Sequence, residues 1–302
     1  MAEKPALLVH PPLGLFEMQL TGAYDVVHWP TDRKDITCAV TIGGVGLSNA
    51  MIDALPALKC IVCFGVGVDG LDRAYCEKRG VAITHGRDIN HDDVAEVAAG
   101  LIIAAVRGFT PAEAVLRGGT WKPPLGIPPR RRIRGRKLGV VGMGAIGQAI
   151  AARMAPFGVE IKWFGPRAKP NLPYAYEPDL LKLAEWADIL AVAARGDQTG
   201  LISADMIKAL GADGVIVNIS RGSVIDEDAL IAALKAGELA AAGLDVFREE
   251  PTDASRWAEV PNATLLPHIG GATREALWLG SQNVLENLRR FYAGEELLTP
   301  LI

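Results

Sequence analysis

Short apolar runs alternate with longer segments of helical spacing over the first part of the chain. The runs end in glycine or polar residues, which is typical of short strands buried in a sheet. The predicted strands cover residues 6–10, 25–29, 39–42, 58–64 and 80–84. Segments such as 48–58 and 71–79 between them repeat apolar residues at helical intervals. Strands that alternate with helices predict a parallel α/β sheet.

A long apolar helix is predicted over residues 92–107, with Asp92 and Asp93 in its first turn. Carboxylates in the first turn of a helix interact favourably with the positive end of its dipole. A Gly- and Pro-rich stretch at 118–129 then interrupts regular structure. Beyond it, a second alternating series predicts strands at 137–141, 159–164, 189–193, 215–218, 243–246 and 263–266, with helices that include 227–236 and 274–293.

The second series begins with a glycine-rich turn, Gly142-Met-Gly-Ala-Ile-Gly147, between the strand at 137–141 and an alanine-rich helical stretch. A further strand at 159–164 completes a strand, turn, helix and strand in the order that a dinucleotide-binding unit requires. The first glycine permits the tight turn, the second permits a pyrophosphate to approach, and the third permits close packing of helix and strand. The N–H groups at the helix start would bind the phosphates. The turn therefore predicts cofactor contacts at Gly142, Gly144, Ala145, Ile146 and Gly147.

The residues after the second strand of this unit bear on the choice of cofactor. NAD-binding units usually place Asp or Glu there to bind the ribose 2′-hydroxyl, whereas an Arg nearby accommodates a 2′-phosphate. This chain has Gly165 at that point and Arg167 two residues later. The pattern favours NADPH, with NADH as the other candidate. The alternative is an ordinary turn with a solvated Arg.

Length and composition narrow the class of protein. The chain has 302 residues, half of them hydrophobic, which suits two medium α/β domains. A net charge of −4 predicts no nucleic-acid partner. The basic cluster at 130–137 would bind polyanions or, by the favoured interpretation, form a solvated approach loop. The sequence has no long uncharged apolar stretch that would predict a membrane span, and residues 1–5 do not resemble a signal peptide.

Four cysteines in a chain of this length do not form a disulfide framework. Cys60 and Cys63 match the C-x-x-C spacing of metal and redox sites, but they lie within the predicted buried strand at 58–64. No second cysteine pair is available to complete a zinc site. We therefore expect core cysteines, no metal, and a cytoplasmic location as the default for a chain with free thiols.

Three polar segments follow predicted strands of the second series and supply candidate catalytic groups. Arg221 follows the strand at 215–218, Glu250 follows that at 243–246, and His268 follows that at 263–266. Reduction of a 2-oxo acid needs a cation for the carboxylate and the carbonyl oxygen, and an acid that protonates the new hydroxyl. Histidine suits the acid role, and a Glu bonded to it would fix its tautomer. Each residue alone is more often structural, but the three together behind a dinucleotide motif predict an active site.

The sequence resembles the D-isomer-specific 2-hydroxyacid dehydrogenases over nearly its whole length. The matching stretches are residues 65–69, 92–96, 142–147, 218–222, 243–247 with 249–251, and 267–273, in the family's order and spacing. Residues 163–167, 119–122 and 298–300 are most similar to the NADPH-dependent hydroxypyruvate and hydroxyphenylpyruvate reductases within that family.

The resemblance implies roles for the candidate residues. Arg221 would bind the substrate carboxylate and polarise the 2-oxo group, His268 would donate the proton, and Glu250 would bind His268. Backbone groups of Val66 and Gly67 would hold the substrate carboxylate from the other side of a cleft. Ser220 and Asp245 would join Gly165 and Arg167 among the cofactor contacts, with Asp245 at the nicotinamide amide. The resemblance also implies a homodimer formed through the cofactor domain.

Two departures from the family pattern leave roles open. The family often has Asn-Thr-Pro where this chain has His85-Gly-Arg87, and Arg87 would contact a ligand or face solvent. The turn at 194–199 is shorter than usual and lacks proline, so its cofactor contacts are open, including an added role for Arg195 at a 2′-phosphate.

Since the glycine turn lies in mid-chain, we expect a Rossmann cofactor domain at 98–282 inserted into a flavodoxin-like substrate domain at 1–97 and 283–302. The predicted function is NADPH-dependent reduction of glyoxylate, hydroxypyruvate or an aryl pyruvate to a D-2-hydroxy acid. The alternatives are an NAD-linked dehydrogenase that acts oxidatively and a dinucleotide-sensing interaction protein.

Overall fold

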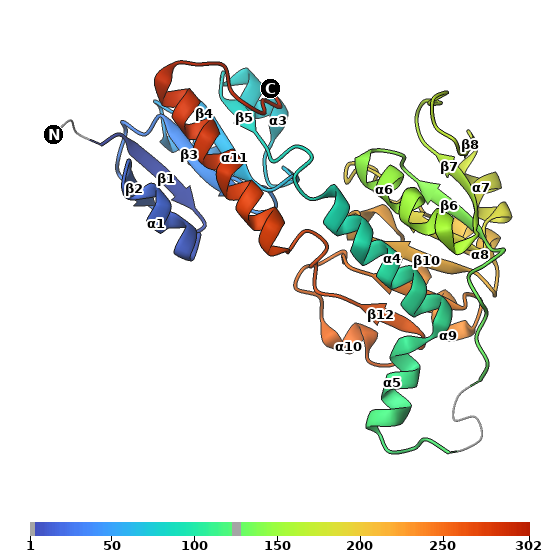
Figure 1. The fold of residues 1–302 in the computed structure, drawn as a ribbon. Helices are drawn as coiled ribbons and strands as arrows, with labels where there is room; N and C mark the ends of the chain where they lie inside the picture. Colours follow the sequence, from blue (N-terminus) through green and yellow to red (C-terminus); the bar gives the residue numbers. More distant parts are fainter. Residues whose placement is uncertain (1–3, 123–127) are drawn as a thin grey trace. The chain divides into compact units, whose positions relative to one another are not determined.

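The computed structural model describes residues 4–122 and 128–302, which form two compact units (Figure 1). Unit 1 comprises residues 1–90 and 274–302, and unit 2 comprises residues 91–273. Each unit has its own parallel sheet and its own hydrophobic core. Residues 1–3 of the segment considered as a signal peptide, and residues 123–127 of the Gly- and Pro-rich stretch, lie outside the described residues.

Unit 1 is built on a five-stranded parallel sheet of order β2-β1-β3-β4-β5. This is the flavodoxin-like order, as the sequence predicted. Helix α11 (Arg274–Ala293) covers one face, where Val284 and Leu288 pack on strand residues. Helices α2 (Asn49–Ala54) and α3 (Arg73–Lys78) cover the other face. The strands are β1 (Ala6–His10), β2 (Asp25–His28), β3 (Cys38–Ile42), β4 (Cys60–Phe64) and β5 (Ala82–Thr84).

Unit 2 is built on a seven-stranded parallel sheet of order β12-β11-β10-β9-β6-β7-β8. The chain starts at β6, adds β7 and β8 on one side, and then crosses over to β9 on the other, which is the Rossmann arrangement. The sequence predicted this order of elements, although the two-residue β8 was too short to be recognised. The strands are β6 (Lys137–Val141), β7 (Glu160–Phe164), β8 (Ala175–Tyr176), β9 (Ile189–Val192), β10 (Val215–Asn218), β11 (Ala241–Leu244) and β12 (Ala263–Leu265).

Helices cover both faces of the unit 2 sheet and form two apolar cores. Helices α4 (His91–Arg107) and α6 (Ala145–Met154) lie on one face. Helices α7 (Leu180–Trp186), α8 (Ala204–Leu210) and α9 (Glu227–Ala236) lie on the other. The Asp226 carboxylate caps α9 by accepting the N–H of Ala229 at 3.0 Å.

The borders of the two units lie at helix ends, whereas the expected borders fell within helices. The expected border at 97/98 lies inside α4, which belongs to unit 2 from its first residue because its buried side packs on that unit's sheet. The expected border at 282/283 lies inside α11, which belongs to unit 1 as a whole. A helix that packs on one sheet moves as part of that unit, so a border within it is physically unfavourable.

Three further features complete the description of the chain. Cys38, Cys60, Cys63 and Cys76 are free and buried, which confirms the prediction of core cysteines. Helix α5 (Phe109–Arg117), which follows the left-handed Gly108, was not predicted. Within the described residues, no single helix is long and apolar enough to span a membrane. The pair α4 and α5 meets that criterion together but is bent by 66°.

Candidate active site

Three neighbouring strands of unit 2 bring the predicted catalytic residues to one edge of the sheet. Strands β10, β11 and β12 run side by side and in parallel, so their carboxyl ends face the same way. Arg221, Glu250 and His268 each follow one of these ends within a few residues. In α/β sheets this edge is where ligands bind.

His268 and Glu250 form a hydrogen-bonded pair. The His268 Nδ1 lies 2.6 Å from Glu250 Oε2, while Glu250 Oε1 accepts the N–H of Phe247 at 3.0 Å. Because a carboxylate only accepts, Nδ1 carries a proton, and Nε2 is the ring atom left for a substrate. The two side chains are 45% and 34% exposed, so a substrate could reach the ring.

The Asp245 side chain holds the turn that carries His268. The buried Asp245 carboxylate accepts the N–H of Ile269 at 2.8 Å and that of Gly270 at 2.7 Å. Burial raises the pKa of Asp245, and these two N–H groups oppose that shift. His268 itself has a φ of +53°, a strained conformation for a side-chain-bearing residue. The carboxylate thus compensates for local strain and holds the turn that orients the His268 ring.

Arg221 is positioned by the side chain of Asn218 at the end of β10. The Asn218 amide donates to the Arg221 carbonyl at 2.9 Å, while its oxygen accepts the N–H of Ser220 at 3.0 Å. The Arg221 guanidinium donates to the Ser220 carbonyl at 2.7 Å. The Ser220 hydroxyl donates to the Ala194 carbonyl, which joins this loop to the turn after β9. The sequence contains Asn218 in the matching stretch, but this bracing role depends on the folded turn.

Gly222 permits the Arg221 loop and the Glu250 loop to touch. A Cβ on Gly222 would lie 1.8 Å from the carbonyl carbon of Phe247, which no packing adjustment of a side chain can relieve. Phe247 donates its N–H to Glu250, as noted above. The close backbone contact therefore sets the spacing between the guanidinium loop and the carboxylate loop.

The glycine turn at the end of β6 fits a bound dinucleotide. Gly142 has a φ of +93°, and a Cβ there would lie 2.5 Å from the Ala193 carbonyl oxygen. A Cβ on Gly147 would lie 2.0 Å from the Gly142 carbonyl oxygen, so α6 packs tightly on the turn. A Cβ on Gly144 would meet nothing within 4 Å among the described residues, which leaves this side of the turn open to a ligand. Ala145 and Ile146 begin α6 there, where free N–H groups attract phosphate.

The segment after β7 carries a cation that sequence reasoning missed. The exposed Arg167 lies in this segment as expected, and the Gly165 carbonyl before it accepts the Tyr176 hydroxyl at 2.9 Å. Lys169 donates from its ammonium to the Met143 carbonyl, within the glycine turn, at 2.7 Å. An ammonium has further donors for a phosphate. A second cation two residues after Arg167 was the available signal. Arg195, by contrast, pairs with Asp197 at 3.1 Å.

The remaining candidates lie in unit 1 or concern a metal. Val66 and Gly67 are partly exposed in the loop after β4, where Gly65 adopts a φ of +99°. In residues 4–122 and 128–302, no group of His, Cys, Asp and Glu side chains has the arrangement of a metal site.

Comparison with known proteins agrees with this geometry. Residues 99–270 match the family described as "D-isomer specific 2-hydroxyacid dehydrogenase, NAD binding domain". The 2-ketogluconate reductase of Gluconobacter oxydans is 38% identical over 313 residues, which cover 100% of both chains. The hydroxyphenylpyruvate reductase of Plectranthus scutellarioides is 39% identical over 272 residues, with 89% of this chain and 86% of that one covered.

The solved structures include the NADPH-dependent glyoxylate/hydroxypyruvate reductase of Sinorhizobium meliloti in complex with NADP and malonate. It is 33% identical and superposes with a TM-score of 0.91, with 99% of this chain and 97% of that one covered. The match extends over both units and includes the glycine turn and the three strand ends described above. The chain therefore belongs to the D-isomer-specific 2-hydroxyacid dehydrogenase family and is an NAD(P)-dependent dehydrogenase or reductase of that family.

Proposed function

We propose that the protein reduces small 2-oxo acids to D-2-hydroxy acids with NADPH, and that glyoxylate and hydroxypyruvate are its main substrates. The observation that carries this proposal is the His268–Glu250 pair at 2.6 Å, next to the Arg221 loop and in the same unit as a glycine turn open to a dinucleotide. An aryl pyruvate and 2-ketogluconate are further candidates, because relatives named for such substrates are of similar identity.

The residues of unit 2 would divide the chemistry among them. Bound NADPH supplies the hydride. Arg221 binds the substrate carboxylate and polarises the 2-oxo group, so negative charge that develops on the carbonyl oxygen is stabilised. His268 donates the Nε2 proton to that oxygen, while its Nδ1–H stays bonded to Glu250. Glu250 stabilises the charged imidazole before transfer and keeps the ring in place afterwards.

Cofactor binding would use the glycine turn and the segment after β7. The N–H groups at the start of α6 suit the pyrophosphate. Arg167 and Lys169 provide two cations near the position of a ribose 2′-phosphate, and Gly165 provides no carboxylate to compete. These features support a preference for NADPH over NADH. Ser220 and Asp245 would contact the nicotinamide part, since each lies at a carboxyl end of a neighbouring strand.

Substrate binding would also use unit 1. Backbone N–H groups of Val66 and Gly67 would bind the substrate carboxylate, because neither donates a hydrogen bond within the part of the chain that the structure describes. Two such donors match the two oxygens of a carboxylate.

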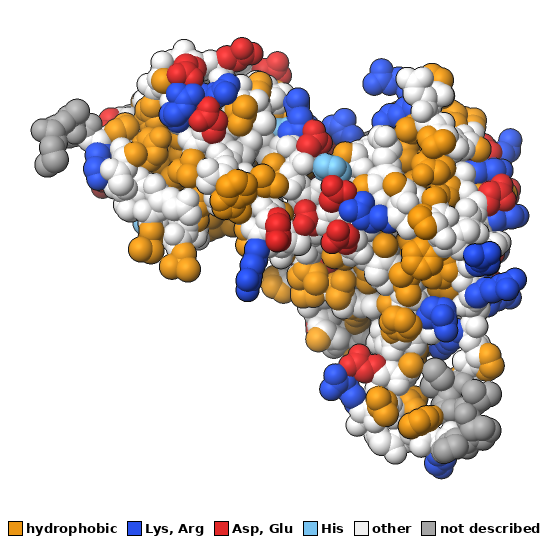
Figure 2. All heavy atoms as spheres, viewed as in Figure 1, with side chains coloured by type: hydrophobic (Ala, Val, Ile, Leu, Met, Phe, Trp, Pro, Cys, Tyr) orange, Lys and Arg blue, Asp and Glu red, His pale blue; other side chains and the backbone are white. Residues whose placement is uncertain are grey.

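A homodimer would cover exposed apolar surface on unit 2. Helix α5 has no buried residue, and Phe109 on it is 55% exposed and Leu116 is 64% exposed. Figure 2 shows a few orange side chains in the region of α5 at its lower end, among white and charged ones. Light scattering on a sizing column should give twice the chain mass at micromolar concentration, and a monomer mass would remove this part of the proposal.

The NADPH preference is tested by substitution of Arg167 and Lys169. Loss of a charged hydrogen bond is worth about 1.5–3 kcal/mol, so each Ala variant should raise the NADPH KM by about 10- to 150-fold. The NADH KM serves as an internal control and should change little. Equal effects on both cofactors would mean that neither cation contacts a 2′-phosphate.

A further inference from the structure

The proposed carboxylate-binding N–H groups of Val66 and Gly67 share their peptide planes with two anchored carbonyl groups. The Gly65 carbonyl, in the plane of the Val66 N–H, accepts the N–H of Gly86 at 2.7 Å. The Val66 carbonyl, in the plane of the Gly67 N–H, lies 3.1 Å from His85 Nδ1. Because a trans peptide is planar, a fixed carbonyl also fixes the direction of the N–H on its opposite side. The segment after β5 therefore orients both N–H donors through the carbonyl groups on the opposite side of their peptide planes.

The anchor on the Val66 carbonyl requires a proton on His85 Nδ1. A carbonyl only accepts, so Nδ1 carries a proton in the neutral ring as well as in the charged one. His85 Nε2 is buried and has no hydrogen-bond partner among the described residues. The bond through Nδ1 is thus the polar contact that holds the ring in the described part of the chain.

The Gly67 peptide would be easy to rotate if this anchor were lost. Gly67 has no Cβ to restrict its backbone, and a glycine peptide changes direction at low steric cost. The loop also packs on the loop after β3, where a Cβ on Gly43 would lie 1.5 Å from the Gly67 carbonyl oxygen. That contact confines the far side of Gly67 but does not set the direction of its N–H. The His85 ring is the group that does so.

The C-terminal tail holds the backbone of His85. The Thr299 carbonyl accepts the His85 N–H at 3.2 Å, and Leu301 donates its N–H to the Ile83 carbonyl at 2.8 Å. Thr84 and Pro300 form an antiparallel bridge between these bonds. The tail therefore pairs with the open edge of β5 and continues as far as the residue that carries the imidazole.

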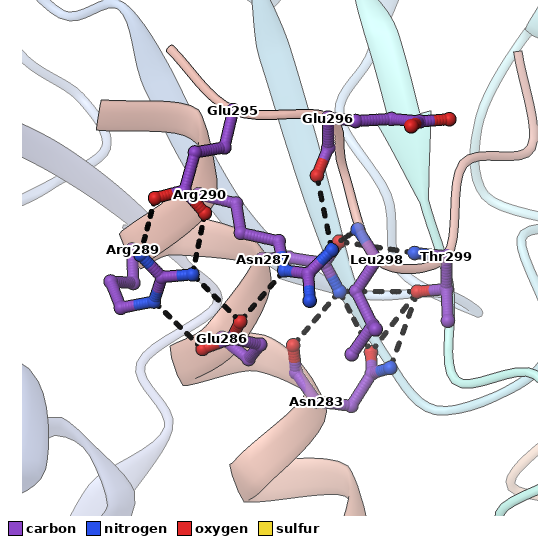
Figure 3. A network of polar contacts seen from close by, with 9 residues as sticks. All are labelled: Asn283, Glu286, Asn287, Arg289, Arg290, Glu295, Glu296, Leu298 and Thr299. Atoms are coloured by element: carbon purple, nitrogen blue, oxygen red, sulfur yellow. Dashed lines mark hydrogen bonds and ion pairs between the residues drawn. The ribbon is translucent and has the colours of Figure 1, made fainter. Parts of the chain in front are cut away.

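Helix α11 holds the tail through two buried asparagines (Figure 3). The Asn287 oxygen accepts the N–H of Leu298 at 3.0 Å and that of Thr299 at 3.3 Å. The Asn287 amide donates to the Thr299 hydroxyl at 3.1 Å and to the Asn283 carbonyl at 2.8 Å. Each donor and acceptor of this carboxamide is used, so the position of Thr299 is closely specified.

We propose that His85 is a positioning residue for the substrate carboxylate and that the C-terminal tail, held by Asn287, supports it. The inference rests on the proposed function, because the N–H groups of Val66 and Gly67 meet a carboxylate only in that case. His85 acts through the Val66 peptide and does not touch the substrate. His85 is one of the residues in which this chain departs from the pattern that the family often shows.

Two substitutions of His85 distinguish a role of its hydrogen bond to the Val66 carbonyl from a role of its side-chain volume alone. His85→Leu keeps an apolar side chain but removes the donor to Val66. His85→Asn keeps a side-chain N–H donor near the position of Nδ1. We expect His85→Leu to raise the KM for glyoxylate about three- to tenfold, the worth of one neutral hydrogen bond, with a smaller change in kcat and an unchanged Kd for NADPH. His85→Asn should restore most of the wild-type KM.

The chain offers a matched control in the same sheet. His28 Nδ1 lies 3.1 Å from the Val9 carbonyl, the same type of bond at a strand far from the β4–β5 edge, although its Nε2 also pairs with Glu17 at 3.2 Å. His28→Leu should leave the glyoxylate KM unchanged. Asn287→Leu, which releases the tail, should raise that KM in the same direction as His85→Leu.

Binding of oxalate to the NADPH complex, measured by calorimetry, provides a readout without turnover. Weaker oxalate binding in His85→Leu, with recovery in His85→Asn, supports the inference even if the wild-type protein reduces none of the oxo acids tested. That last result would count against the proposed function alone. If His85→Leu matches the wild type in both KM and oxalate affinity, or if Leu and Asn behave alike, the positioning role is wrong. If Asn287→Leu folds and keeps the wild-type KM for glyoxylate, the C-terminal tail does not support the positioning role of His85.

Discussion

The bond between His268 and Glu250 gives a prediction with a magnitude. In Glu250→Gln the side chain keeps its shape, and its amide oxygen can still accept the N–H of Phe247. The nitrogen then faces His268 Nδ1, so a donor replaces the carboxylate that accepted the Nδ1 proton. The ring loses a charged partner and its preferred tautomer at once.

The size of the effect follows from the geometry and exposure of the pair. A hydrogen bond to a charged group contributes about 1.5–3 kcal/mol. His268 is 45% exposed and Glu250 is 34% exposed, so solvent screening places this pair at the lower end. A loss of about 1.5 kcal/mol corresponds to a decrease in kcat/KM of about tenfold.

The assay is steady-state oxidation of NADPH with a 2-oxo acid at saturating cofactor. Glu249→Gln is the matched control, because the exposed neighbouring carboxylate is neutralised without a change at His268. We expect wild-type kinetics from Glu249→Gln and the tenfold loss from Glu250→Gln, with NADPH affinity unchanged in both. A Glu250→Gln variant within twofold of the wild type, or an equal loss in both variants, would refute the role assigned to this bond.

Three further perturbations test other parts of the site. In Gly222→Ala the new Cβ overlaps the Phe247 carbonyl, so the free energy of unfolding in urea should fall by about 1–3 kcal/mol, and unchanged stability would contradict that packing. Burial raises the pKa of Asp245 above its ordinary 3.8, so its contribution to stability is present below that value and is lost as the pH rises through the raised pKa. The stability of the wild type minus that of Asp245→Asn should therefore decrease as the pH rises from 3.8, and an increase would reverse the assigned sign. His268→Ala should lower kcat by about 10²- to 10⁴-fold and leave the Kd for NADPH unchanged, whereas unchanged turnover would exclude it as the proton donor.

Local chemistry made much of the fold predictable, and it also pointed to the candidate catalytic residues. The glycine turn needs three residues without a Cβ, and the described contacts of Gly142 and Gly147 show why. The three catalytic candidates were found because parallel strands bring their carboxyl ends to one edge, so chain position after a strand predicts proximity. The confirmed order of both sheets follows from the same alternation of apolar runs and helical segments.

Features that depend on contacts distant in sequence were not predictable. Lys169 was visible in the sequence as a cation two residues after Arg167, but its bond to the Met143 carbonyl depends on the folded turn. Strand β11 begins two residues earlier than expected, at Ala241, because small alanines carry little strand signal although they are fully buried between neighbouring strands. The tail contacts of His85 depend on pairing between residues far apart in the chain.

The most direct test of the central proposal is the ratio of kcat/KM for NADPH to that for NADH, measured with glyoxylate and hydroxypyruvate as oxo acids. The arrangement of Gly165, Arg167 and Lys169 predicts turnover with both acids and a ratio well above ten. A ratio below one would contradict the 2′-phosphate site while the catalytic set remained. No turnover with either cofactor would contradict the proposed substrates.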